Sequence, residues 1–202
     1  MRISSDGRWT VITYRQVDWT YADQFDGIPM TVEVTSEYRV EKEDRGLGGF
    51  ALREVPVVPY TKDFRLDIDE SMARWEEQFD VSNWGFFMAF DGDVPVAAAS
   101  VAGRTEGMEM LAGRRDLAVL WDIRVADSHK HQGIGKTLFT MAADWARSEG
   151  YKQLKIECQN NNVPAIRFYH KQGAVLGGID EYAYYTHPEY KHEVQLLWYL
   201  DL

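Results

Sequence analysis

A strand, a basic glycine turn, a helix, a second strand and a second helix follow one another within residues 120–172, and this order constrains the fold more than any other feature. Residues 117–126 have the apolar-rich pattern of a mostly buried strand. From Ile134 to Ala146 apolar residues recur at helical spacing, and Gly150 provides a stop. The sequence therefore predicts a strand and a helix joined by a short loop, with the helix beginning inside the glycine turn.

The glycine turn, Lys-His-Gln-Gly-Ile-Gly-Lys over residues 130–136, is suited to bind phosphate. A helix that starts in such a turn directs unpaired backbone N–H groups and the positive end of its dipole toward one point. Gly133 and Gly135 have no side chain to keep a pyrophosphate away from those amides, and Lys130 and Lys136 add positive charge on either side. The alternative is an ordinary strand-to-helix turn, because a lone Gly-x-Gly is a weak signal.

Two familiar phosphate-binding motifs do not fit this turn. The nucleoside-triphosphate loop needs a glycine where this chain has Lys130. The dinucleotide fingerprint needs a glycine where it has Leu138. The remaining pattern is Lys-x-x-Gly-x-Gly after a strand.

The second strand and the helix after it add a stripe of functional candidates. Residues 154–158 alternate like a strand, and Asn162 is placed to cap a helix that ends at Gly173. At about 3.6 residues per turn, Asn162, Ala165 and Tyr169 fall along one stripe. A slender amide-bearing chain could lie along it. The alternative is that Ala165 and Tyr169 merely pack against the sheet.

Together these motifs resemble the GCN5-related N-acetyltransferase (GNAT) family. The family pattern Asn-x-x-Ala-x-x-Phe-Tyr is met at Asn162, Ala165, Phe168 and Tyr169. Lys130 departs from the arginine or glutamine usual at the first position of the family's pyrophosphate loop, keeping the charge without arginine's planar fork. The resemblance implies an α/β (α+β) fold: a mixed, mostly antiparallel central sheet with helices on both faces and a splayed pair of strands holding acetyl-CoA.

The resemblance also implies direct acetyl transfer from acetyl-CoA to an amine. Tyr169 would protonate the departing thiolate, a modest transfer between a phenol of pKa about 10 and a thiol of pKa about 8.5. Glu157 would take the proton of the amine, or would only bind the substrate. Asp122 competes for that role, because a carboxylate in an apolar strand is costly to bury unless it is paired or functional. Arg124 is expected on the same side of the strand and could simply neutralise Asp122.

The site residues implied by the resemblance fall into three groups. Catalytic roles go to Tyr169 and Glu157. Cofactor contacts go to Ile123 and Val125, whose backbone would hold pantetheine and polarise the thioester, and to Lys130, His131, Gln132, Gly133, Ile134, Gly135, Lys136, Asn162, Ala165 and Tyr169. Substrate contacts go to Asp122, Glu157, Tyr60 and Tyr182. No metal is expected, because the spacing of the histidines does not indicate a metal site.

Composition restricts the partners and the compartment. The formal charge of -10 argues against a nucleic-acid partner and favours cationic substrates. Cys158 is the single cysteine, so no disulfide forms within the chain, and a buried strand position is expected for it. There is no apolar run of membrane-spanning length, which predicts a cytoplasmic protein with no membrane partner. It would act as a monomer or homodimer.

The whole chain is expected to form a single domain over 1–202. Within it we expect a divergent substrate-side half over 1–80, an acetyl-CoA-binding core over 117–176 and C-terminal strands over 177–202. Further strands are predicted over 9–15, 31–40, 84–90, 94–102 and 193–200, the third and fourth forming a hairpin. A helix is predicted over 71–79, a solvated loop over 41–49, and pairing of 108–111 with the strand after Gly113.

Some further stretches of the chain are similar to the streptothricin acetyltransferases, a group within the family. The similarity lies in residues 58–64, in 120–125 and in the terminal strand that follows the tyrosines at 182, 184 and 185. It implies acetylation of a primary amine on the β-lysine arm of that cationic antibiotic, giving resistance, in an acidic and aromatic pocket. The alternatives are a protein N-terminus, a lysine or a polyamine as acceptor, or a non-catalytic acyl-CoA-binding module.

Overall fold

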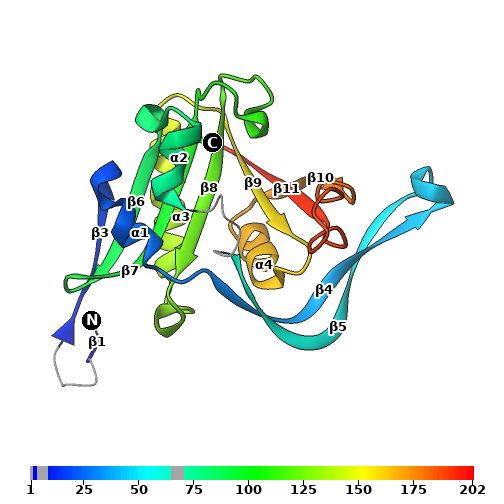
Figure 1. Cartoon of the computed structure of the whole chain (residues 1–202), viewed down its shortest axis with the longest axis horizontal. Coiled ribbons are helices and arrows are strands. Elements are labelled where there is room, and N and C mark those ends of the chain that lie inside the picture. Colours follow the sequence, from blue (N-terminus) through cyan, green and yellow to red (C-terminus); the bar gives the residue numbers. More distant parts are fainter. Residues whose placement is uncertain (1, 4–8, 65–70) are drawn as a thin grey trace. The chain divides into compact units, whose positions relative to one another are not determined.

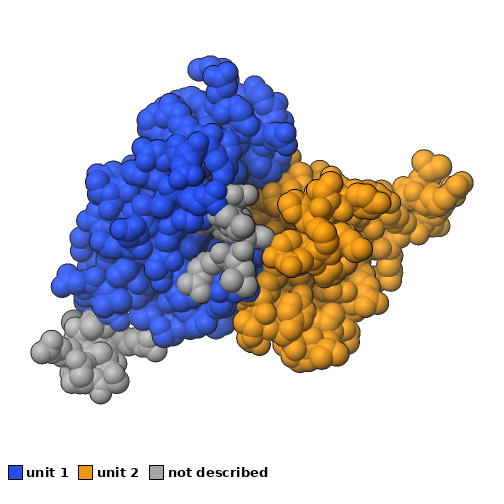
Figure 2. Space-filling view, in the orientation of Figure 1, with its two compact units in different colours: residues 1–31, 63–155, 201–202 blue, residues 32–62, 156–200 orange. Residues whose placement is uncertain are grey.

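The computed structural model describes residues 2–3, 9–64 and 71–202 of the chain. It divides into two compact units (Figure 2): unit 1 has residues 1–31, 63–155 and 201–202, and unit 2 has residues 32–62 and 156–200. The core predicted over 117–176 is thus shared between them. The single domain over 1–202 stays a prediction.

Four antiparallel strands form the sheet of unit 1. In spatial order they are β3 (Ile12–Val17), β6 (Gly85–Asp91), β7 (Val94–Gly103) and β8 (Leu117–Val125). The predicted hairpin of β6 and β7 is confirmed. The strand predicted over 9–15 is interrupted at Val11, because β2 (Trp9–Thr10) pairs with β1 (Arg2–Ile3) whereas β3 pairs with β6.

Helices cover both faces of this sheet, as predicted (Figure 1). On one face lie α1 (Ala22–Asp26) and α2 (Met72–Gln78), and on the other lies α3 (Ile134–Ser148). Period-two alternation explains the division, since Phe86 packs with the α1–α2 side whereas Phe87 meets Trp145 of α3 with ring centroids 6.3 Å apart. The Asp26 carboxylate accepts a hydrogen bond from the Met72 N–H at 2.8 Å, so the end of α1 caps α2.

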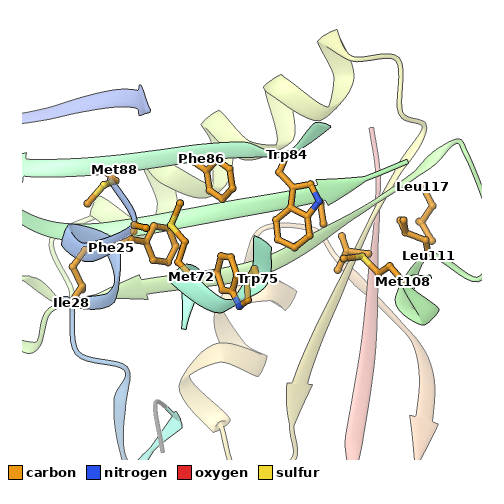
Figure 3. Close-up of a cluster of buried hydrophobic side chains, with 14 of the residues drawn as sticks. Phe25, Ile28, Met72, Trp75, Trp84, Phe86, Met88, Met108, Leu111 and Leu117 are labelled. Carbon is orange, nitrogen blue, oxygen red and sulfur yellow. The ribbon is translucent and has the colours of Figure 1, made fainter. Parts of the chain in front are cut away.

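A hydrophobic core cluster lies between α1, α2 and the sheet (Figure 3). Its centre is aromatic: Trp75 meets Phe25 and Trp84 with ring centroids 5.7 Å apart in each case. Each large side chain buried here stabilises the fold by roughly 1.5–3 kcal/mol. This core holds β8, the predicted cofactor strand, from one side.

A β-bulge changes the phase of β8. Ser100 of β7 is opposite Asp122, but the next residue, Val101, is opposite Leu120, so Trp121 is the extra residue. Val119 before the bulge and Arg124 after it therefore both face the α1–α2 side. The bulge is what brings a charged residue onto the core side of this strand.

Unit 2 combines a long ribbon with a second group of strands. The ribbon is formed by β4 (Thr31–Glu43) and β5 (Gly49–Asp63), and it extends as a twisted hairpin in Figure 1. The other strands lie in the order β9 (Gln153–Gln159), β11 (Gln195–Asp201) and β10 (Val175–Asp180), with the last two antiparallel. One helix, α4 (Val163–Lys171), belongs to this unit. The strand ends at Thr31, at Asp63, at 153–155 and at Asp201 belong to unit 1.

Several element predictions are confirmed, and three points besides the interruption at Val11 need correction. The helices predicted over 71–79, after Gly133 and after Asn162 are confirmed, as are the strands at 154–158 and 193–200. The solvated loop over 41–49 is shorter than predicted, because β4 continues to Glu43 before a 3-10 turn at Asp44–Gly46. No strand is predicted over the residues of β5, because prolines 56 and 59 weaken a strand pattern.

The third correction concerns residues 108–111, which do not extend beside β8. Glu109–Leu111 forms a 3-10 turn instead, with Ala112 and Gly113 both at positive φ. Met108 and Leu111 are buried in the core cluster, so their apolar pattern indicates burial and not strand pairing. Within residues 2–3, 9–64 and 71–202, no helix has the length and apolar character needed to cross a bilayer.

Candidate active site

The start of α3 has the geometry of an anion site. Gly133 precedes the helix with φ of +83°, a conformation that glycine adopts at little cost, and it has no side chain to cap the helix. The Thr137 N–H donates to the Gly133 carbonyl at 3.0 Å, while the amides of the turn before it have no earlier helical carbonyl to bond. At Gly135 an added Cβ would lie 3.5 Å from Val125 Cγ2, an ordinary contact, so the protein's own packing does not require glycine there.

The charged and polar residues of this turn are placed differently from one another. Lys136 and His131 are exposed, and His131 has a positive φ of 61°. Gln132 donates from Nε2 to the Ser128 carbonyl at 3.0 Å. Lys130, whose side chain is 35% exposed, is paired with the carboxylate of Asp127 at 2.6 Å. Of the two lysines, Lys136 is therefore the one whose charge is exposed beside the α3 amides.

Asp122 lies in a buried ion pair. Arg124 Nε donates to Asp122 Oδ1 at 3.0 Å, Arg124 Nη2 reaches Oδ2, and the two side chains are 1% and 0% exposed. The guanidinium also lies 4.9 Å from the centre of the Phe25 ring and 3.4 Å from the Ile28 carbonyl. This arrangement supports the neutralising role of Arg124 that the sequence offered as the alternative, and the substrate role of Asp122 stays a prediction.

The predicted pantetheine residues of β8 lie on the opposite face. Val125 points toward α3, as its contact distance at Gly135 indicates. Ile123 shares that side by strand alternation. Both are partly exposed, in contrast to Asp122 and Arg124.

The helix α4 positions the second set of predicted residues. Asn162 Oδ1 accepts a hydrogen bond from the Ala165 N–H at 3.3 Å, which is the N-cap that the sequence predicted. Tyr169 is buried, 6% exposed, and meets Phe168 edge to face at 5.5 Å. The predicted helix start is therefore confirmed, and it sets the stripe that carries Ala165 and Tyr169.

Glu157 of β9 has a hydrogen-bonded partner that the sequence did not single out. Tyr184 Oη donates to Glu157 Oε1 at 2.6 Å, and Gln159 Nε2 donates to the same phenol oxygen at 3.1 Å. Burial, and then the negative charge of Glu157, raise the pKa of Tyr184 well above its ordinary value. The phenol therefore stays protonated and acts as a donor to the carboxylate.

Tyr182, the tyrosine predicted to contact the substrate, lies on the surface. Tyr182 is 70% exposed, and its N–H donates to Asp180 Oδ1 at 2.8 Å. Nothing in the sequence distinguishes Tyr184 from Tyr182, because the turn after β10 decides which phenol reaches Glu157.

Tyr60 belongs to a polar network formed by three distant segments. Asn161 Nδ2 donates to Tyr60 Oη at 3.1 Å and to Glu193 Oε1 at 2.9 Å. Lys62 Nζ lies 2.6 Å from both oxygens of Glu193 and 5.1 Å from the centre of the Tyr190 ring. Burial raises the pKa of Tyr60, and the charge of Glu193 adds to the effect. Sequence reasoning missed Asn161, Lys62 and Glu193, since their positions in the chain give no sign of their contact.

Two other residue types bear on the chemistry. Cys158 is buried, and burial raises the pKa of its thiol to about 12. Among residues 2–3, 9–64 and 71–202, no three His, Cys, Asp or Glu side chains lie close enough together to hold a metal ion.

Comparison with known proteins defines the class. The profile described as "Acetyltransferase (GNAT) family" matches residues 51–174, so the chain belongs to this family. It is an acetyl-CoA-dependent N-acetyltransferase, and the predicted fold and enzyme class are confirmed.

Among its relatives, the streptothricin acetyltransferase of Escherichia coli is 32% identical over 151 residues, which are 75% of this chain and 76% of that protein. The crystal structure of nourseothricin acetyltransferase matches with a TM-score of 0.73 and 27% identity, covering 94% of this chain and 98% of that one. A putative streptothricin acetyltransferase from Bacillus anthracis, solved in complex with acetyl coenzyme A, matches with a TM-score of 0.72 and 22% identity over 95% and 98% of the two chains. This last likeness concerns the fold alone.

Proposed function

We propose that this enzyme transfers the acetyl group of acetyl-CoA to a primary amine of a small cationic acceptor, a streptothricin-type antibiotic with a β-lysine arm, and so gives resistance. The observation that carries the proposal is the 32% identity to a streptothricin acetyltransferase over three quarters of the chain. The acidic and aromatic groups around Glu157 and Tyr184 are of the kind that a cationic amine needs. The reaction would take place in the cytoplasm.

Cofactor contacts are proposed in each unit by itself, on α3 and β8 in unit 1 and on α4 in unit 2. Amides of Ile134, Gly135 and Lys136 would hold the pyrophosphate, with the Lys136 ammonium beside them. The backbone of Ile123 and Val125 would bind pantetheine. Since Asn162 uses its Oδ1 to cap α4, its Nδ2 is the group that would donate to a pantetheine carbonyl.

The chemical step is proposed to use two proton-transfer groups. Glu157 would accept a proton from the acceptor's ammonium, which frees the nitrogen lone pair to attack the thioester carbonyl carbon. The tetrahedral oxyanion would be stabilised by backbone N–H groups of β8. When the carbon–sulfur bond breaks, Tyr169 would protonate the sulfur. The nitrogen, cationic since its attack, would give its second proton to solvent, and solvent would restore the Tyr169 phenol and take the proton held by Glu157, so that the products are an amide and free coenzyme A.

Coenzyme A release, followed with a thiol reagent, tests the proposal. We expect saturable release from acetyl-CoA that depends on streptothricin at neutral to mildly alkaline pH. The protein's own thiol does not interfere, because Cys158 is buried and protonated in this range. Release with a polyamine or a peptide amine but not with streptothricin would transfer the activity to the alternative acceptors, and tight acetyl-CoA binding without release to any amine would leave a binding module.

A further inference from the structure

We propose that Lys130 positions the cofactor loop by tying it to the first residue of β4, and that it does not contact the pyrophosphate. The inference rests on the proposed binding of acetyl-CoA at the start of α3. It assigns a structural task to the position at which this chain departs from the family pattern.

Three residues form a closed set of contacts before α3. Lys130 Nζ lies 2.6 Å from Asp127 Oδ1 and donates to the Thr31 carbonyl at 2.7 Å. Thr31 Oγ1 in turn donates to Asp127 Oδ2 at 3.1 Å. Thr31 is the residue at which the chain enters β4, so the contacts join the cofactor loop to a segment nearly a hundred positions earlier.

The charge of Lys130 is offset by this arrangement. An ammonium group has three N–H donors, and a carboxylate and a backbone carbonyl already engage it. The Lys130 hydrogen bond is also the largest cause of the lowered pKa of Asp127, which keeps that carboxylate ionised. Lys136 differs, because its side chain is exposed and it has no ion pair within the part of the chain that the structure describes.

A lysine suits position 130 because its partners there are a carboxylate and a backbone carbonyl. A compact ammonium can approach a carboxylate and a carbonyl at once, whereas the planar fork of arginine is suited to a bidentate partner such as a phosphate. The same turn is held from its other side, since His129 Nε2 lies 3.2 Å from Asp91 Oδ2 at the end of β6. The two attachments fix the turn at Asp127–His129 from which the α3 amides follow.

The variant Asp127→Asn distinguishes a positioning role of Lys130 from a direct phosphate contact, because the two roles predict opposite changes in acetyl-CoA affinity. If Lys130 ties the loop to Thr31, both Asp127→Asn and Lys130→Met weaken acetyl-CoA binding by about two- to fivefold, and the double variant is no worse than the weaker-binding single. If Lys130 contacts phosphate, Asp127→Asn frees its charge and leaves binding equal or tighter, which would overturn the proposal. Isothermal titration calorimetry at two salt concentrations measures both.

Two control variants complete the test. Asp144→Asn removes a matched exposed ion pair, Asp144 with Arg147 at 2.7 Å and the same spacing, from the far end of α3 and is expected to leave binding unchanged. Lys136→Met is expected to weaken binding and to reduce its salt dependence.

Amide hydrogen exchange of the unliganded protein provides a readout that does not depend on the cofactor. Faster exchange over residues 127–133 in Asp127→Asn supports the positioning role even if wild-type protein fails to bind acetyl-CoA, a result that would refute the proposed function alone. Unchanged exchange there overturns the proposal for Lys130.

Discussion

Among the residues that the structure describes, each compact unit holds a buried ion pair, and the two pairs are built differently. Asp122 and Arg124 lie two residues apart on one strand, are almost fully enclosed and face the aromatic core through Phe25. Lys62 and Glu193 lie 131 residues apart, are 10% and 5% exposed, and share their network with Asn161. The first pair neutralises charge within an apolar core, whereas the second joins β5, the turn before α4 and the segment before β11.

The two pairs suggest different tasks: one neutralises a charge inside the core, and the other belongs to a polar network of carboxylates and phenols. A charge neutralised by its own strand neighbour can stay in the core, as Asp122 does beside Arg124. A polar network assembled from distant segments lies where the ribbon, β9 and the C-terminal strands supply carboxylates and phenols together. In unit 2 the charge of Glu193 contributes to the raised pKa of both Tyr60 and Tyr184, so these groups share one electrostatic environment.

The largest effect is expected from breaking the Asp122–Arg124 pair. Arg124→Met should lower the free energy of unfolding by about 3–5 kcal/mol, because an uncompensated carboxylate remains buried. The double variant Asp122→Leu with Arg124→Met should recover most of the loss. Urea denaturation measures both. A stable Asp122→Asn protein that lost turnover would instead return Asp122 to the substrate site.

Removal of the proposed acid, Tyr169, or the proposed base, Glu157, should lower kcat much more than it lowers the free energy of unfolding. Tyr169→Phe is expected to reduce kcat by about a hundredfold or more, and Glu157→Gln similarly, because each loses a proton transfer in the transition state. The dissociation constant of acetyl-CoA should change little in Glu157→Gln. A loss of less than a few-fold in turnover would contradict these roles.

A smaller loss of stability is expected at the second ion pair. Lys62→Met should cost about 1–3 kcal/mol, less than the β8 variant, since Glu193 keeps its hydrogen bond from Asn161 and can gain water. Arg53→Met, which removes an exposed pair with Glu41 at 3.0 Å in the same ribbon, is the matched control and should change stability by less than about 1 kcal/mol. Equal losses at Lys62 and Arg53 would show that burial of the network does not matter.

Tyr184→Phe is expected to have a moderate effect on rate. The phenol donates a hydrogen bond to the Glu157 carboxylate, so its removal leaves the proposed base without the partner that orients it. Turnover at neutral pH should fall by about two- to tenfold. Tyr182→Phe, which changes an exposed neighbour, should leave turnover unchanged.

The raised pKa of Tyr184 also predicts the alkaline stability of the fold. The unfolded chain releases the phenol proton near pH 10, whereas the folded protein keeps it to higher pH. The contribution of Tyr184 to stability is therefore fully present below about pH 10 and is lost as the pH rises above it. Between pH 8 and 11, the free energy of unfolding should fall less steeply with pH in Tyr184→Phe than in the wild-type protein.

Local signals allowed much of the cofactor half to be predicted. Asn162 and Gly173 bracket α4 because a side-chain oxygen and a left-handed residue act on the nearest backbone groups. The glycine turn marked the start of α3 for the same reason. The strand pairing predicted for residues 108–111 was wrong, because an apolar pair at short spacing is as typical of a buried 3-10 turn as of a strand.

The sequence by itself determined the family, the helices that carry the glycine turn and Tyr169, and the composition of the proposed site. Tertiary structure decided that Tyr184 and not Tyr182 reaches Glu157, that Lys62 pairs with Glu193, and that Lys130 is held by Thr31 and Asp127. The reason is the range of the forces involved. Caps, turns and periodicity act over a few residues and are written in the local sequence, whereas a hydrogen bond between distant segments exists only after the strands have brought their ends together.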